Sequence, residues 1–375
     1  MKTFDQAVGN IAGVRKAIDE GPFDAVIAVS PENVRYIADV EIATQKSIRD
    51  RLALILWAKG HEPVFIVCQV EEGFVRQETW ITDIRGFKEF VTSPIDLLAE
   101  VLAEKGLTHA RIGCELEYLA GKYVRQLETL MPRVVLEPCD QMFRRARMIK
   151  TQREKDILRF GFRGTEKAML ATYATVKEGE DEWSLVRRLA DHIILSGSDL
   201  VAFNHINAGP NTGFPHAGPS NYRVQKGDIV KADSGGYYQS YISNVGRTAK
   251  LGKPTQEESD TWKRLREIHH NTIDLLRPGN TGRQVFEAAA IMHEKARLPF
   301  PFAHNGHSIG LEVHEAPFIG PYEDTVYEAG MISTVETRVR WVGQKGLHME
   351  DLFEITENGP RLLSDAFDNE EIFVI

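Results

Sequence analysis

The sequence predicts a two-domain protein in which an α/β domain over residues 1–148 precedes an α+β domain over residues 149–375. Three observations predict this organisation. In residues 1–140, short apolar runs alternate with amphipathic helical patterns, as in a layered α/β domain. A helix-start signal then follows at residues 151–154, and beyond residue 202 the pattern changes to strand-like runs separated by glycines. A chain of 375 residues is long enough for two domains of ordinary size.

The first domain is expected to alternate strands with helices. Two of its strands should pair around the turn at Lys59-Gly60, because a glycine there allows a tight reversal. No clustered set of acids, histidines and nucleophiles occurs in this half of the chain, so we expect no catalytic site here. Helical segments are predicted at residues 7–20, 32–37, 95–105 and 118–130, and strands at residues 25–29, 52–57, 64–68, 112–116 and 134–137.

The second domain is predicted to begin within residues 148–151. Thr151 is followed three positions later by Glu154, the capping-box pattern in which a hydroxyl and a carboxylate satisfy first-turn amides. A long helix should run from there to about residue 176. Glycine is typical of helix ends because it adopts the left-handed conformation, so the next helix should stop at Ser196-Gly197. Further helices are predicted at residues 183–195, 257–276 and 282–296.

Composition and charge exclude several classes of protein. The net charge of -9 argues against nonspecific nucleic-acid binding, which needs a basic surface to displace counterions from phosphates. Cys68, Cys114 and Cys139 form no CxxC pair, so neither a disulfide framework nor a zinc finger is expected. No apolar run approaches the roughly 18 residues of a membrane span. We therefore expect a cytoplasmic protein that binds neither nucleic acid nor membrane.

Acid and imidazole side chains recur in short clusters between residues 207 and 356. Hard divalent cations prefer carboxylate oxygens and imidazole nitrogens, which a protein must gather from several strands. This pattern predicts a metal site in the second domain. The clusters are PHAGP around His216, KADSGG around Asp233, HNGHSIGLEVHE with His307 and His314, TVETR around Glu336, and HMEDLFEIT around Glu350.

These clusters resemble those of the pita-bread hydrolases, the family of methionine aminopeptidase, aminopeptidase P, prolidase and creatinase. The order of the residues and their spacing both agree with that family. The resemblance implies a pita-bread catalytic domain preceded by a creatinase-type N-terminal α/β domain. It also implies that His216 and His314 contact substrate. By the same match, the metal-ligand positions are Asp233, Asn244, His307, Glu336 and Glu350.

Three positions depart from the family pattern. Asn244 stands where the metal enzymes have a second aspartate that bridges two ions, so the set brings three negative charges instead of four. An asparagine offers only a neutral carbonyl oxygen, which binds a hard cation more weakly. Thr337 replaces the proline that usually follows the fourth ligand, and His348 replaces the arginine that usually stands two residues before the last glutamate.

The resemblance implies a metal-dependent hydrolase of a C–N bond in a small substrate, with an Xaa-Pro dipeptide or N-terminus as the first candidate. A divalent cation would activate water for attack on the carbonyl, and Glu336 would shuttle the proton. His216 and His314 would hold the substrate and stabilise the oxyanion. Manganese is the usual metal in such enzymes, and cobalt, zinc or iron would satisfy the same ligands. Family members commonly form homodimers, so we expect one here.

Two alternatives stay open at the level of sequence. The first is a metal-poor or metal-free amidohydrolase of the creatinase or ectoine-hydrolase kind, because Asn244 removes a bridging charge. The second is a non-catalytic pita-bread protein that uses its cleft to bind partners. A binding role needs no convergence of imidazoles and carboxylates, so this second alternative is the weaker one. The residues present together are His216, His307, His314, Glu336 and Glu350.

Two local motifs resemble those of other protein classes, a serine hydrolase and a phosphate-binding protein, but lack the features that those classes need. Gly306-His307-Ser308-Ile309-Gly310 fits the G-x-S-x-G nucleophile elbow, but no helix pattern follows it and His314 comes too soon to be the triad base. The loop around Gly213 lacks the Gly-Lys-Ser/Thr ending of a phosphate-binding loop. His304 is expected near the substrate or behind the metal ligands, and a surface position would fit it almost as well.

Overall fold

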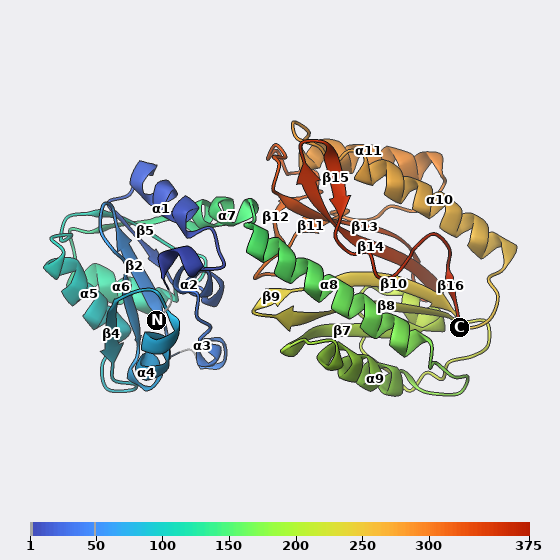
Figure 1. Ribbon diagram of the computed structural model, residues 1–375, viewed down its shortest axis with the longest axis horizontal. Coiled ribbons are helices and arrows are strands. Elements are labelled where there is room, and N and C mark those ends of the chain that lie inside the picture. Colours follow the sequence, from blue (N-terminus) through green and yellow to red (C-terminus); the bar gives the residue numbers. More distant parts are fainter. Residues whose placement is uncertain (1–2, 49) are drawn as a thin grey trace. The chain divides into compact units, whose positions relative to one another are not determined.

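The computed structural model describes residues 3–48 and 50–375. The chain divides into two compact units, one ending at Arg147 and the other beginning at Met148. Each unit is built around its own β-sheet (Figure 1). Hydrophobic clusters form a separate core in each unit, so each could in principle be stable by itself.

The first unit holds a six-stranded mixed sheet in the order β4-β3-β2-β1-β5-β6. The central pairs β1–β2 and β2–β3 are antiparallel, and the outer pairs are parallel. The strands are β1 (Ala25–Ala28), β2 (Leu54–Ala58), β3 (Val64–Cys68), β4 (Asp83–Phe87), β5 (Arg111–Cys114) and β6 (Val135–Pro138). The helices are η1 (Phe4–Gln6), α1 (Ile11–Glu20), α2 (Pro31–Ala38), α3 (Ala43–Ser47), α4 (Gln69–Glu78), α5 (Pro94–Glu104), α6 (Gly121–Leu130) and α7 (Asp140–Met148).

The sequence prediction for this unit is correct for the strand pair β2–β3 and wrong at two helix starts. Helix α1 begins at Ile11 instead of residue 7, because the Asn10 side chain accepts a hydrogen bond from the Gly13 amide and caps the helix there. Helix α6 begins at Gly121 instead of residue 118. Helices η1, α3, α4 and α7 and strand β4 were not predicted. The apolar positions of α4 are few, with only Val75 buried, so its periodic signal is weak.

The second unit contains an eight-stranded sheet whose main path runs β13-β14-β10-β8-β7, with β15, β16 and β9 at its margins. A separate two-stranded sheet joins β11 to β12. The strands are β7 (Leu200–Ala208), β8 (Ile229–Tyr238), β9 (Tyr241–Ile242), β10 (Val245–Lys250), β11 (His307–Ser308), β12 (Glu315–Phe318), β13 (Ile332–Trp341), β14 (Lys345–Thr356), β15 (Gly359–Leu362) and β16 (Phe373–Val374). The helices are α8 (Gln152–Tyr173), α9 (Glu182–Leu195), η2 (Gly209–Gly213), α10 (Gln256–Ile273) and α11 (Gly282–Lys295).

Helices α8 to α11 form two consecutive pairs that pack against the sheet (Figure 1). The predicted capping box of α8 is confirmed, because the Glu154 amide donates to Thr151 Oγ1 and the Thr151 amide donates to Glu154 Oε2. In both pairs, a glycine with positive φ precedes the second helix, Gly179 before α9 and Gly279 before α11. This repeated architecture was not evident as a sequence repeat.

A buried arginine connects the helices to the sheet. Arg247 on β10 is fully buried, and its guanidinium forms ion pairs with Glu166 on α8 and with Asp351 on β14. It also donates to the backbone carbonyls of Gly246, at 2.9 Å, and of Glu350, at 2.5 Å. The Arg247 side chain therefore holds α8, β10 and β14 together.

We predict that Arg247→Ala destabilises the chain by about 3–5 kcal/mol, because the change removes the cationic partner of the buried carboxylates of Glu166 and Asp351. Urea unfolding of the purified protein measures this loss. As a control, Arg283→Ala removes an exposed ion pair with Asp324 and should cost at most about 1 kcal/mol. Equal stability losses for the two variants would contradict the proposed importance of the buried cluster.

Candidate active site

Three acidic side chains lie in one row across the large sheet. Asp233 on β8 is paired with Gly246 on β10, Gly246 is paired with Glu350 on β14, and Glu350 is paired with Glu336 on β13. Residues directly opposite each other on neighbouring strands point to the same face of a sheet. The strand register therefore brings Asp233 together with two carboxylates that lie more than 100 residues further along the sequence.

His307 and Asn244 complete the set of predicted ligand positions. His307 Nδ1 donates to the Ser308 carbonyl at 2.9 Å, which leaves Nε2 unprotonated and facing the acids. That Nε2 lies 3.5 Å from Glu350 Oε1 and 3.5 Å from Asn244 Nδ2. Asn244 Nδ2 donates to Glu350 Oε1 at 3.1 Å, while Asn244 Oδ1 has no hydrogen-bond partner among the described residues.

His348 is a further member of this cluster, although the sequence marked it only as a departure from a pattern. Its Nε2 lies 3.2 Å from Glu336 Oε1, and its Nδ1 lies 3.8 Å from Asp233 Oδ2. The buried side chains offer two groups of three potential cation ligands that share Glu336. The groups are Asp233, Glu336 and His348, and His307, Glu336 and Glu350.

The electrostatics of the cluster favour a bound cation. Burial raises the pKa of Glu350, and the charges of Glu336 and Asp233 raise it further. Burial also opposes ionisation of Glu336, but Arg338 and His348 hold its pKa below the usual range. Glu350 Oε2 and Asn244 Oδ1 are buried oxygens without a partner among the residues described. Oxygen and imidazole donors of this kind fit a divalent metal, which would neutralise the crowded charge.

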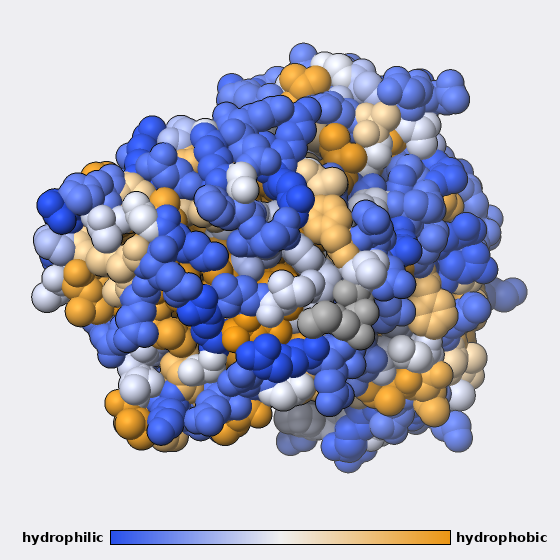
Figure 2. Space-filling model, turned by 60° about the vertical axis from the view of Figure 1, so that its left-hand side comes forward, coloured by the Kyte–Doolittle hydropathy of each residue, from blue (hydrophilic) through white to orange (hydrophobic). Residues whose placement is uncertain are grey.

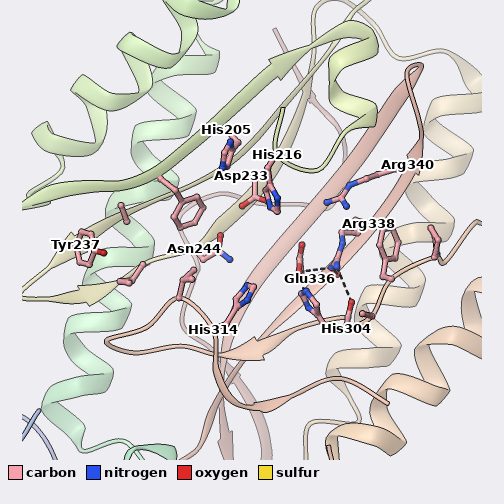
Figure 3. A pocket seen from close by; sticks show the side chains of 17 residues that line it. His205, His216, Asp233, Tyr237, Asn244, His304, His314, Glu336, Arg338 and Arg340 are labelled. Atoms are coloured by element: carbon pink, nitrogen blue, oxygen red, sulfur yellow. Dashed lines mark hydrogen bonds and ion pairs between the residues drawn. The ribbon is translucent and has the colours of Figure 1, made fainter. Parts of the chain in front are cut away.

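A cavity of about 690 Å³ opens above the acids (Figure 3). Its apolar wall includes Phe203, Ile242 and Phe302, and its polar wall carries several imidazoles. A volume of this size suits a small molecule or a short peptide. Polar residues around it are His205, His216, Asp233, Tyr237, Asn244, His304, His314, Glu336, Arg338 and Arg340.

His216 and His314 both line this cavity, where the sequence placed the substrate contacts. His216 follows η2 on an exposed loop, and its Nε2 lies 3.9 Å from Asp233 Oδ2. Lys231 steadies that loop by donating to the Phe214 carbonyl at 2.6 Å. The His314 ring centroid lies 4.2 Å from that of His307, and partial burial lowers the pKa of His314. His314 is therefore neutral at neutral pH and can donate a hydrogen bond.

His304 also lines the cavity and is half-buried. It therefore does not occupy the surface position that the sequence had left open for it. Burial lowers its pKa to about 4 despite the nearby Glu336, whose Oε2 is 3.6 Å from His304 Nδ1. For His307, burial lowers the pKa to about 3. Both rings are thus neutral at neutral pH, as cation ligation requires.

Arg338 and Arg340 were missed, although both follow Glu336 on β13 at even spacing. Side chains at i, i+2 and i+4 of a strand share one face, and this alternation could have found them. Arg338 contacts Glu336 Oε2 at 2.7 Å and donates to the His304 carbonyl at 3.1 Å. Thr337 faces the other way and contacts His269 on α10 at 2.9 Å. The threonine that replaces the family's proline at this position therefore has its side chain away from the acidic cluster.

His205 is a second missed residue of the cavity. It lies on β7 directly opposite Asp233, so it extends the row of acids by one strand. The His205 and His216 rings are tilted toward each other, with centroids 5.0 Å apart. No local motif surrounds His205 in the sequence, and only the β7–β8 register reveals its position.

The G-x-S-x-G match does not form a nucleophile elbow. Ser308 lies on the short strand β11, which pairs with β12 and is not followed by a helix. The Lys150 ammonium donates to Ser308 Oγ at 3.2 Å and to Glu315 at 2.8 Å. Ser308 is therefore part of a buried support for the His307–His314 segment.

A buried carboxylate and imidazole cluster beneath a peptide-sized cavity defines a metal-dependent hydrolase of the pita-bread class. Comparison with known families agrees, because residues 157–357 match metallopeptidase family M24 and residues 11–149 match the creatinase/prolidase N-terminal domain. The first match covers more than half of the chain, and the chain belongs to metallopeptidase family M24. The predicted fold, a creatinase-type domain followed by a pita-bread domain, is confirmed.

Similar proteins include peptidases of archaea and bacteria. The chain is 26% identical to the Xaa-Pro dipeptidase of Pyrococcus furiosus over 352 residues, which are 93% of this chain and 95% of that protein. The solved prolidase structure from Pyrococcus furiosus, also 26% identical, has a TM-score of 0.82 and covers 94% of this chain and 100% of its own. The Xaa-Pro dipeptidase structure from Bacillus anthracis has a TM-score of 0.87 at 23% identity, covers 98% of this chain and 99% of its own, and shows likeness of fold.

The surface gives no indication of a membrane segment. Among the residues described, no helix combines the length and the apolar character needed to cross a bilayer. Figure 2 shows hydrophilic residues over much of the visible face, with hydrophobic residues between them. Isolated hydrophobic residues on a surface are ordinary and need no partner to explain them.

We predict that His307→Ala lowers the bound divalent metal, whereas His314→Ala leaves it unchanged and lowers turnover. His307 Nε2 faces the acids, while His314 lines the cavity. The loss of turnover should be of the order of 10² to 10⁴, as for a positioned proton-transfer or oxyanion group. Elemental analysis and steady-state kinetics measure the two effects. Loss of metal from His314→Ala would show that the two roles are assigned wrongly.

Proposed function

We propose that the chain hydrolyses the peptide bond of Xaa-Pro dipeptides in a metal-dependent reaction. The observation that carries this proposal is the pair of buried ligand groups sharing Glu336 at the floor of the cavity. Membership of the M24 family and similarity to proteins named Xaa-Pro dipeptidase support the same activity. A metal-free amidohydrolase is less well supported, because the crowded buried carboxylates are costly without a cation.

We propose Asp233, Asn244, His307, Glu336 and Glu350 as positions that hold the metal. When bound, the divalent cation would supply Lewis-acid activation of the carbonyl and of the attacking water. Manganese is the usual metal of the family, and the residues above are also compatible with cobalt, zinc or iron.

The side chains around the cation have separate tasks in this proposal. Glu336 is kept ionised by Arg338, so its carboxylate can accept a proton from the attacking water and pass it to the leaving nitrogen. Neutral His314 can donate its N–H to the substrate carbonyl oxygen as negative charge develops there. His216, on its loop at the cavity rim, can hold the substrate from the opposite side.

Arg340 supports a dipeptide as the substrate. Its guanidinium points into the cavity (Figure 3), and it has no hydrogen-bond or ion-pair partner among the described residues. Burial and the neighbouring Arg338 lower the pKa of Arg340 to about 10, which leaves it positively charged at neutral pH. An unpaired, half-buried cation requires an anion, and the free C-terminal carboxylate of a dipeptide would provide one.

The direct test is hydrolysis of Ala-Pro by protein stripped with a chelator and then reloaded with Mn²⁺, Co²⁺ or Zn²⁺. We expect no turnover of the stripped protein and restored turnover with at least one cation. Ala-Ala serves as the control for proline specificity. Full activity of metal-stripped protein would favour the metal-free alternative, and inactivity with every cation would contradict the proposed substrate.

We predict that Arg340→Ala raises KM for Ala-Pro by about 10- to 100-fold, which corresponds to loss of a charged hydrogen bond. The same substitution should leave KM for Ala-Pro-amide nearly unchanged, since the amide lacks the carboxylate. Arg283→Ala, at an exposed ion pair, is the control. An equal effect of Arg340→Ala on both substrates would rule out carboxylate recognition by this residue.

The expected homodimer and cytoplasmic location remain predictions. The dimer is proposed from the family resemblance, and light scattering at micromolar concentration tests it against a monomer of 42.3 kDa. A cytoplasmic location agrees with the lack of a spanning helix among the described residues, and fractionation of the source cells tests it.

A further inference from the structure

We propose that His348 is a metal ligand that replaces the carboxylate missing at Asn244, and that the resulting site prefers zinc, cobalt or ferrous ions over manganese. This inference rests on the metal dependence proposed above. It goes beyond that function because it assigns a new ligand and a different preferred class of cation.

Backbone hydrogen bonds and the space above Gly246 place the His348 side chain beside the acids. Its backbone amide donates to Thr248 Oγ1 at 2.9 Å, and its carbonyl accepts from the same hydroxyl at 2.8 Å. The imidazole lies against β10 at Gly246, where a Cβ atom would come within 2.6 Å of the ring. Gly246 thus provides the space that the ring occupies in the middle of the acidic row.

The ring nitrogens of His348 face the acids. The side chain is fully buried, with Nε2 at 3.2 Å from Glu336 Oε1 and 3.9 Å from Glu350 Oε2, and Nδ1 at 3.8 Å from Asp233 Oδ2. A cation or a proton between the ring and these carboxylates would offset the cost of burying them side by side.

Asn244 and His348 together change the chemistry of the site. The resemblance places an aspartate and an arginine at these two positions, and this chain has an asparagine amide and a histidine imidazole. Each of the two ligand groups then has one imidazole, His348 in the first and His307 in the second.

The expected metal preference follows from these donors. Carboxylate-rich sites suit manganese and magnesium, whereas imidazole suits zinc, iron, nickel and copper. Relative to the family pattern, the ligand set loses one carboxylate and gains one imidazole, which lowers the negative charge of the ligands and raises their nitrogen content. Both changes weaken manganese binding more than the binding of zinc, cobalt or ferrous ions.

A four-variant cycle tests the ligand assignment without using activity. Wild type, Asn244→Asp, His348→Leu and the double variant are stripped of metal and titrated with Zn²⁺ and Mn²⁺ by calorimetry. We expect His348→Leu to weaken one Zn²⁺ site by more than the roughly 10- to 100-fold that loss of a supporting residue costs. Asn244→Asp in the His348→Leu background should restore binding and shift it toward Mn²⁺.

His293→Leu is the matched control, because His293 is also a buried histidine whose two ring nitrogens lack partners among the described residues, and it is outside both ligand groups. It should leave both metal affinities unchanged. Unaltered Zn²⁺ binding in His348→Leu would overturn the inference. A Mn²⁺ affinity of wild type equal to its Zn²⁺ affinity would overturn the proposed preference.

A measurement on the wild-type chain covers the case in which His348→Leu does not fold. Pulsed EPR of the Cu²⁺-loaded protein detects the remote nitrogen of each coordinated imidazole. We expect signals from two imidazoles, and a single imidazole would contradict the inference. These binding results are independent of catalysis, so failure to cleave Ala-Pro would reject the proposed function and leave the ligand assignment standing.

Discussion

The structure of the second unit depends on the buried ion cluster of Arg247. This guanidinium joins carboxylates from α8 and β14 and also binds the Glu350 and Gly246 carbonyls. His269 on α10 contacts the same Asp351 at 3.1 Å, so the cluster reaches a second helix. Such a network is costly to bury, and it is stable only when every member is paired. Its effect is to fix β10 and β14 at the point where the acids of the site meet.

The site is a consequence of strand register more than of any single motif. Asp233, Glu350 and Glu336 face one another because their strands are aligned through Gly246. A slip of one residue in any strand would turn its acid to the opposite face, toward the helices. The residue at Gly246 must be small, since a side chain there would collide with His348. Fold stability and ligand geometry are therefore set by the same strands.

The sequence predicted much of this arrangement because the acids and histidines occur in distinctive local clusters. Asp233, His307, Glu336 and Glu350 could be chosen from those clusters and from the family resemblance. His348 was visible only as an unexpected residue, because its role depends on the space above Gly246 on another strand. Arg340 could have been found from its even spacing to Glu336 on β13, whereas His205 could not be chosen without knowing that β7 pairs with β8 beside Asp233.

The fold was predictable for a similar physical reason. Helical patterning identified α8, α10 and α11, and the capping box at Thr151 also located the start of α8, so local signals agree there with the final packing. Helix α4, with a single buried apolar residue, carries little periodic signal, and α1 begins where Asn10 caps it instead of where the apolar pattern begins. These differences arise where capping and tertiary contacts, and not periodicity, decide the boundary.

The central claim is that the acidic row and its imidazoles form a cation site beneath a peptide-binding cavity. Anomalous diffraction at a metal absorption edge, from crystals of metal-loaded protein, tests this claim most directly. The account predicts anomalous peaks within about 2.0–2.3 Å of the side chains of Asp233, His307, Glu336, His348 and Glu350. Full loading in solution with no peak among these residues, or a peak only elsewhere in the chain, would contradict it.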